Sequence, residues 1–324
     1  MATADQLKGL IRSSAAGDNA TFYGIVLQIA ANELQSGHVK LAGELRKLVE
    51  GAKSDKRAGF AKPVGYAQPS SDLAGLLTVA YPKTRLSDMA FADPLRARID
   101  RVLTEYRASE RLRSHGFSPM RKLLLVGVPG TGKTMTAAAL AGELEMPLFS
   151  IRLDSLITSF MGETARKLRV VFDEIKATRG VYFFDEFDAL GSDRSSNNDV
   201  GEIRRVLNSF LQMLEQDDSD SMIVCATNFV GMLDRALFRR FDAVLEYSLP
   251  DGEIALRVMQ GRLALLDTST IDWQQAATCA KGLSHAEMVA ACEQAAKNAI
   301  LDQKTSVRNS ELESAIQERF SHRA

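Results

Sequence analysis

Short apolar runs alternate with amphipathic segments through the middle of the chain, which is the pattern of a parallel β-sheet with crossover helices. We expect buried strands at 123–126, 147–153, 181–184, 222–226 and 243–248. Apolar residues at helical spacing predict helices at 96–114, 135–144, 164–176 and 202–214. From residue 250 onward the pattern is helical alone, with helices expected at 253–266, 273–279, 284–303 and 310–319. The sequence therefore predicts an α/β domain followed by helices.

Three apolar stripes at helical spacing predict three short helices within residues 1–52. Such helices bury their stripes only against each other or against a partner, so we expect a small helical domain. An adaptor or substrate-docking module is the functional interpretation, and an appendage without a specific partner is the alternative. The composition then shifts to Lys, Ser, Gly, Pro and Ala, and we assign residues 53–85 to a linker.

Composition narrows the classes of partner and compartment. The 324 residues are 45% hydrophobic and carry a net charge of −1, so bulk electrostatics gives no case for a nucleic-acid or membrane partner. The longest apolar stretch, at 24–31, is interrupted by Gln28, and we expect no membrane span. Three cysteines without metal-ligand spacing indicate reduced thiols, as in the cytoplasm.

The strongest chemical signal follows the first apolar run, in the sequence GVPGTGKT at 127–134. Its spacing, Gly127-x-x-x-x-Gly132-Lys133-Thr134, is that of a phosphate-binding loop between a strand and a helix. Glycines let the backbone amides curl around phosphate groups, and the helix that follows adds its positive end. Lys133 is expected to reach the β- and γ-phosphates, and the Thr134 hydroxyl to bind magnesium.

Two later apolar runs end in polar residues that suit a P-loop hydrolase. Asp185 and Glu186 directly follow the run at 181–184, so that one carboxylate can hold magnesium and the other can orient the attacking water. Asn228 follows the run at 222–226, and its amide can contact the water or the γ-phosphate. Taken alone, the acid pair is also common on surfaces, and the asparagine in turns.

Two further segments leave alternatives open. Phe160 and Met161 stand beside Gly162 in a predicted loop, where large apolar side chains indicate either burial or a contact surface for a polypeptide. Arg239 and Arg240 form either a solvated surface pair or an arginine finger that stabilises charge in phosphoryl transfer.

Together these motifs resemble the AAA family of the AAA+ ATPases over residues 86–324. GVPGTGKT resembles Walker A with Val128 in place of the commoner proline, VYFFDE resembles Walker B, and ATN resembles sensor 1. ALFRRFD is similar to the arginine-finger segment without the frequent Pro-Gly between the arginines, and GLSHAE is similar to a lid segment in which glycine usually stands at His285. The resemblance implies a P-loop AAA+ wedge at 86–250 with a five-stranded parallel sheet of order 5-1-4-3-2, and a helical lid at 251–324.

The resemblance also implies site residues. The pore loop that contacts substrate would be Phe160, Met161 and Gly162, and catalysis would use Glu186, Asn228, Arg239 and Arg240. Thr134 and Asp185 would bind Mg²⁺. The residues expected to bind ATP are Ala92, Asp93, Gly127, Pro129, Gly130, Thr131, Gly132, Lys133, Thr134, Met135, His285 and Ala286.

A hexameric ring that unfolds or remodels protein substrates by threading them through its pore is the function that this resemblance implies. Some small stand-alone relatives in bacteria occur beside a subtilisin-like peptidase, which makes such a peptidase a possible partner. The alternatives are a factor that disassembles a complex without full threading and a nucleotide-gated scaffold. A helicase-like motor is disfavoured because the chain lacks a basic stripe.

Overall fold

The computed structural model describes residues 75–156, 161–190, 199–228 and 235–321, together with Val26, Ile29, Gly43 and Leu73. The chain divides into two units, residues 1–65 and 66–324. Val26, Ile29 and Gly43 are helical. The rest of the helical domain expected at 1–52 lies outside the described residues, so the bundle and its docking role stay predictions.

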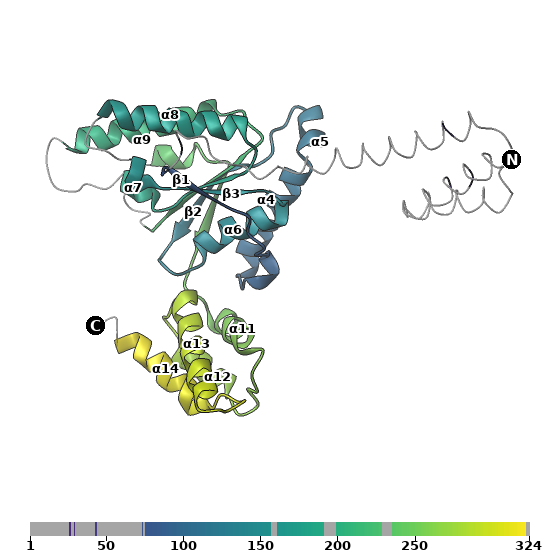
Figure 1. Ribbon diagram of the computed structural model, residues 1–324, viewed down its shortest axis with the longest axis vertical. Helices are drawn as coiled ribbons and strands as arrows, with labels where there is room; N and C mark the ends of the chain where they lie inside the picture. Colours follow the sequence, from purple (N-terminus) through teal and green to yellow (C-terminus); the bar gives the residue numbers. More distant parts are fainter. Residues whose placement is uncertain are drawn as a thin grey trace. The chain divides into compact units, whose positions relative to one another are not determined.

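A six-stranded sheet forms the centre of the second unit (Figure 1), in the order β1-β3-β4-β5-β2-β6. β3 pairs with β4, β4 with β5, and β2 with both β5 and β6, and all four pairings are parallel. Because parallel strands end at the same edge, the polar residues that follow β2, β4 and β5 gather there. The strands are β1 (Leu77–Ala80), β2 (Lys122–Gly127), β3 (Leu148–Ile151), β4 (Val181–Phe184), β5 (Met222–Thr227) and β6 (Ala243–Tyr247).

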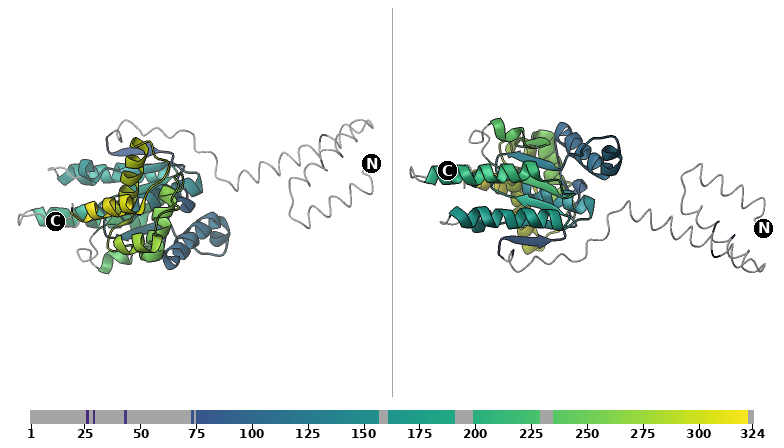
Figure 2. Two further views of the ribbon diagram at one scale, coloured as in Figure 1. Left: turned by 90° about the horizontal axis from the view of Figure 1, so that it is seen from below. Right: turned by 90° about the horizontal axis from the view of Figure 1, so that it is seen from above.

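Successive residues of each strand point to opposite faces, and each face buries its own apolar cluster. In β2, Leu124 and Val126 belong to the cluster that includes side chains of α8 (Met161–Ala177) and α9 (Asp199–Gln216). Leu123 and Leu125 belong to the cluster with side chains of α4 (Asp93–Arg107) and α6 (Lys133–Leu144). Figures 1 and 2 show α8 and α9 side by side over one face, and Figure 1 shows α4 and α6 on the other. The sheet is therefore the middle of three layers.

The sheet has one strand more than the five predicted, and this strand is not parallel. β1 pairs antiparallel with β3, with Leu77 opposite Ile151, and its four residues lie within the range assigned to the linker. A four-residue edge strand carries too few positions for a clear period of two, which is why the apolar pattern alone did not reveal it. Leu77 nonetheless lies in the core of the α8–α9 face.

The single helix predicted at 96–114 is also wrong, because the structure divides it into α4 and α5 (Ser109–Ser114). The break lies at Ala108, whose φ of −95° and ψ of 16° are not helical. Alanine is a strong helix former, and neither glycine nor proline marks the break in the sequence. α4 begins at Asp93 because Pro94 is tolerated in the first turn, where its missing N–H has no partner to lose.

Four helices follow β6 and enclose an apolar cluster of their own, which includes Met259, Leu283 and Ile316. Asp251 and Ser284 cap two of these helices, and the Ser284 hydroxyl and the Glu287 carboxylate form a reciprocal capping box. We call residues 252–321 the lid. Its helices are α11 (Gly252–Leu263), α12 (Trp273–Cys279), α13 (His285–Leu301) and α14 (Asn309–Ser321).

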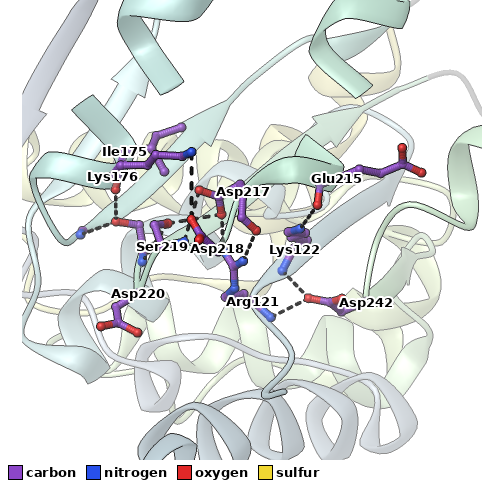
Figure 3. A network of polar contacts seen from close by, with 12 residues as sticks. Arg121, Lys122, Ile175, Lys176, Glu215, Asp217, Asp218, Ser219, Asp220 and Asp242 are labelled. Atoms are coloured by element: carbon purple, nitrogen blue, oxygen red, sulfur yellow. Dashed lines mark hydrogen bonds and ion pairs between the residues drawn. The ribbon is translucent and has the colours of Figure 1, made fainter. Parts of the chain in front are cut away.

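A buried ionic network holds the beginning of β2, at the edge of the sheet opposite the P-loop (Figure 3). The guanidinium of Arg121 pairs with the carboxylate of Asp217, whose side chain is fully buried. Asp242 accepts hydrogen bonds from the backbone amides of Arg121 and Lys122, at 2.9 and 2.8 Å. The strand that leads into the P-loop is thus fixed where it starts.

Candidate functional site

The P-loop connects β2 to α6 through backbone conformations that favour glycine. Gly130 and Gly132 have φ of 76° and 98°, in the left-handed region that L side chains rarely adopt. A side chain at Gly127 would also collide with Tyr247, because its Cβ would lie 2.2 Å from the Tyr247 carbonyl oxygen. The three glycines are therefore required by the turn and by its contact with β6.

Lys133 lies in the first turn of α6, and its ammonium group is held inside the loop. It donates hydrogen bonds to the carbonyl oxygens of Gly127 and Val128, at 2.7 and 3.0 Å, and to Oδ1 of Asn228, at 2.8 Å. Burial lowers the pKa of Lys133, and the carboxylates of Asp185 and Asp188 oppose that shift. The structure thus brings together two predicted residues, Lys133 and Asn228, that are 95 positions apart in the sequence.

Thr134 and Asp185 also lie next to one another, as a magnesium site would require. The Thr134 hydroxyl donates to Oδ2 of Asp185 at 2.9 Å, and the Thr134 side chain is exposed at the mouth of the loop. A hydroxyl and a carboxylate are oxygen ligands of the kind that Mg²⁺ prefers, and bound Mg²⁺ would neutralise charge on the phosphates. The donor set therefore fits the expected ion.

Glu186 follows Asp185 in a left-handed conformation, with φ of 50°. Non-glycine residues adopt this region at a cost of about 1 kcal/mol, and such strain gathers at functional sites. The backbone amide of Glu186 donates to Oδ1 of Asp185 at 2.9 Å, and the Glu186 side chain is exposed. The two adjacent carboxylates consequently have different surroundings, one tied to Thr134 and one open.

Asp188 is a third acidic residue of this site, and it was not among the predicted site residues. It accepts a hydrogen bond from the Thr227 hydroxyl at 3.1 Å and one from the backbone N–H of Asn228 at 3.3 Å. The end of β5 is therefore held by the 3-10 helix that follows β4, η3 (Phe187–Leu190). The sequence offers one signal for this role, the second aspartate of DEFD beside Walker B.

The lid meets the P-loop at the beginning of α13. The amide of Ala286 donates to the carbonyl oxygen of Gly130 at 3.0 Å, and a Cβ at Gly130 would lie 2.5 Å from the Ser284 hydroxyl oxygen. Burial lowers the pKa of His285, and a hydrogen bond with the backbone of Ala90 opposes that shift. The imidazole is therefore placed against the backbone at Ala90, two residues before Ala92, which is expected to bind ATP.

A lid arginine that the sequence did not single out makes the second contact with this segment. Arg257 of α11 donates to the carbonyl oxygen of Phe91 at 2.8 Å. Ala92 is the N-cap of α4, and Asp93 is exposed in its first turn. The predicted ATP-binding residues 92–93 and 285–286 thus lie on two segments that hydrogen bonds join. Nothing in the apolar pattern of the sequence had marked Arg257.

Comparisons with known proteins agree with this geometry. Residues 123–249 match the family model described as ATPase family associated with various cellular activities (AAA). Over 327 aligned positions the chain is 30% identical to an uncharacterized AAA family ATPase, y4kL, of Sinorhizobium fredii, and the alignment covers 100% of this chain and 97% of that protein. The chain belongs to the AAA family of ATPases.

Two other relatives have more specific names and are longer than this chain. A proteasome-activating nucleotidase of Methanoculleus marisnigri is 30% identical over 76% of this chain and 62% of its own length. An ATP-dependent zinc metalloprotease FtsH of Acidothermus cellulolyticus is 34% identical over 76% of this chain and 38% of its own length. The similarity thus spans less than two thirds of either protein. Membership of the AAA family supports ATPase activity and the use of ATP with Mg²⁺.

The remaining predicted site residues of this AAA ATPase lie in the P-loop, at the start of α6 and in the segment 239–240. Pro129 and Met135 are exposed, and Thr131 is buried with its hydroxyl donating to the Val128 carbonyl oxygen at 2.8 Å. Arg239 is exposed, whereas Arg240 forms an ion pair within its own chain. The roles expected for these five residues therefore stay predictions.

The pore-loop assignment stays a prediction, and the structure bears only on where the helix beside it begins. Phe160 lies outside the described residues, while Met161 and Gly162 form the start of α8. The loop predicted before residue 164 is therefore shorter, because the helix begins three residues earlier.

Within the described part of the chain, no helix is both long and apolar enough to cross a membrane.

Proposed function

We propose that this AAA ATPase unfolds or remodels protein substrates, and that it does so as a ring in which ATP hydrolysis drives movement of a polypeptide. One observation carries the proposal. Lys133, Thr134, Asp185 and Asn228 come from β2–α6, β4 and β5, and direct hydrogen bonds join them into two adjacent pairs at the same edge of the sheet. A phosphate-binding cation, a magnesium-binding pair and an amide are thus assembled as ATP hydrolysis requires.

In this mechanism Lys133 exchanges its hydrogen bonds to the loop carbonyls for the β- and γ-phosphates. Thr134 and Asp185 would hold Mg²⁺, which would neutralise developing charge on the phosphates. Glu186, whose side chain is open, polarises the attacking water, and Asn228 contacts the γ-phosphate. Phosphate oxygens beside Lys133 would raise its pKa, against the lowering that burial causes.

A protein substrate is supported by the relatives and by the sequence at residues 160–162, where α8 begins. The names of two relatives refer to activation of a proteasome and to ATP-dependent proteolysis. The sequence Phe160-Met161-Gly162 offers a large ring and a flexible thioether, which grip varied side chains without demanding one sequence. We therefore propose a hexamer whose pore loops contact the threaded chain, with the N-terminal helices docking substrate and a separate subtilisin-like peptidase as a possible partner.

Unfolding of a stably folded, tagged fluorescent protein tests the proposal. Wild-type protein with ATP and Mg²⁺ should abolish the fluorescence, while Phe160→Ala should retain most of its basal ATPase activity and lose unfolding. The ring interior lies away from the ATP site, so hydrolysis does not depend on Phe160. Phe117→Ala is the matched control, because Phe117 is 66% exposed and belongs to no predicted site.

Three outcomes separate the alternatives. Disassembly of a complex by an active enzyme that never unfolds the tagged protein would favour the disassembly factor. Very slow turnover with tight binding of ATP would favour the scaffold. A folded, hexameric Phe160→Ala protein that unfolds the substrate at the wild-type rate would refute the pore-loop assignment.

A further inference from the structure

Arg239 and Arg240 are neighbours in the sequence but have different surroundings. They follow α10 (Arg235–Phe238) and precede β6. The Arg239 side chain is exposed and forms no ion pair with any residue that the structure describes. Arg240 places Nη1 against Oε2 of Glu215, near the end of α9; the Arg240 side chain is 33% exposed and that of Glu215 is 54% exposed. One arginine is open to a neighbouring molecule, and the other is bound within its own chain.

The residues after Arg240 are also fixed inside the subunit. Phe241 is 7% exposed, and its ring packs edge-on against Phe187, with ring centroids 6.4 Å apart. Asp242 accepts the backbone amides that begin β2, and its own amide donates to the Lys122 carbonyl oxygen at 2.8 Å. The backbone beside Arg240 is therefore held by a buried ring, and turning the Arg240 side chain toward another subunit would require the loss of its ion pair with Glu215.

The helix that bears Glu215 is packed against the Walker B segment. Phe210 of α9 contacts Phe184, at the end of β4, and Phe187, directly after Glu186, with ring centroids 5.1 and 4.9 Å apart. Phe187 in turn contacts Phe241. The position of Arg240 is thus set by α9 and by the same aromatic residues that support the acid pair.

We propose that Arg240 is a positioning residue that acts through Glu215 of its own subunit, and that Arg239 alone enters the site of the next subunit. This inference rests on the proposed ring. The ion pair with Glu215 and the anchors at Phe241 and Asp242 hold the backbone at residue 239, so that the exposed guanidinium of Arg239 is presented in one orientation. Glu215 therefore contributes to hydrolysis without touching nucleotide.

A double-mutant cycle with neutral substitutions, measured on the assembled protein, tests whether Arg239 and Arg240 have these different roles. Arg240→Ala and Glu215→Gln remove the same ion pair, so both should lower the ATPase rate by a similar factor, on the order of 10- to 100-fold for a misplaced catalytic group. The double variant should be no slower than either single variant, because the pair acts as one unit. Arg239→Ala should cost on the order of 10³-fold, as loss of an arginine finger does. Glu110→Gln and Arg111→Ala, at exposed positions of α5, are the matched controls.

Exchanging the charges of Glu215 and Arg240 distinguishes a positioning residue from an arginine finger. Glu215→Arg combined with Arg240→Glu restores an intrachain ion pair and should recover activity well above Arg240→Glu alone. A finger at Arg240 would instead leave the reversed protein as inactive as the single variant. The inference is overturned if Glu215→Gln hydrolyses ATP at the wild-type rate while Arg240→Ala loses about 10³-fold. Unchanged ATPase rates in both Arg239→Ala and Arg240→Ala hexamers would instead refute the proposed sharing of sites between subunits.

Discussion

The buried ion pair between Arg121 and Asp217 allows a sharp prediction about stability. The Asp217 side chain is 0% exposed and the Arg121 side chain 10%. Asp217 also accepts hydrogen bonds from the amide and hydroxyl of Ser219, at 3.4 and 3.2 Å, and its carbonyl oxygen accepts one from Arg121. We perturb this site with Asp217→Asn, which preserves the shape of the side chain and removes its charge.

The size of the effect follows from this burial. Asparagine can still accept from Ser219, but it leaves the guanidinium of Arg121 buried without a counter-charge. Removing one partner of a buried pair typically costs about 3–5 kcal/mol in the free energy of unfolding. At about 2–4 °C per kcal/mol for a protein of this size, the melting temperature should fall by roughly 6–20 °C. The loss reflects the stranded charge more than the worth of the pair, so Arg121→Met/Asp217→Asn should be more stable than the sum of the single variants predicts.

Thermal and urea unfolding, monitored by circular dichroism at one protein concentration, measure both effects. Asp218→Asn is the matched control, because Asp218 is 90% exposed and lies 3.9 Å from Lys176. An exposed pair of this kind contributes about 0–1 kcal/mol. The reasoning fails if Asp217→Asn melts within 2 °C of the control (about 1 kcal/mol or less), or if the double variant loses the full sum of the single losses.

Three further predictions concern the site and the thiols. Glu186→Gln should bind ATP with near wild-type affinity in a fluorescent-nucleotide titration and hydrolyse it on the order of a hundredfold more slowly, because only the polarisation of water is lost. Gly130→Ala should weaken nucleotide binding in the same titration, both alone and combined with Glu186→Gln. The added Cβ would lie 2.5 Å from the Ser284 hydroxyl oxygen, at a φ of 76° that L side chains rarely adopt. Wild-type affinity of Gly130→Ala would contradict this prediction. Burial raises the pKa of Cys292 to about 12, so an alkylating reagent at pH 8 should modify the half-buried Cys279 first and reach Cys292 only after unfolding, as peptide mass spectrometry can show.

The parts of the site that the sequence predicted are those whose chemistry is local. Gly127, Gly132, Lys133 and Thr134 sit within one turn, and their spacing alone specifies the loop. Asp185 could be placed near them because the P-loop begins at the end of one buried strand and Asp185 directly follows another. Parallel strands end at one edge, which converts a one-dimensional pattern into a shared location.

The parts that were missed depend on contacts between distant segments. Asp188 matters because it binds the end of β5, and Arg257 because it reaches a carbonyl oxygen 166 positions away. Glu215 looks like any exposed acid at the end of an amphipathic helix. Periodicity reports which face of an element is buried, but not which polar residue on another element it meets.

The lid and the P-loop are linked because Gly130 of the P-loop accepts a hydrogen bond from Ala286 of the lid. The lid encloses its own apolar cluster, so its helices can hold together without help from the sheet. Its contacts with the nucleotide-binding part include the hydrogen bonds of Ala286 with Gly130 and of Arg257 with Phe91. Gly130 is also one of the residues whose backbone conformation shapes the phosphate-binding loop. The start of β2 is fixed by Arg121 and Asp242, so a change in the loop on binding phosphate is not absorbed by sliding of the strand. We therefore expect a displacement of the P-loop to reach the lid through the hydrogen bond between Gly130 and Ala286.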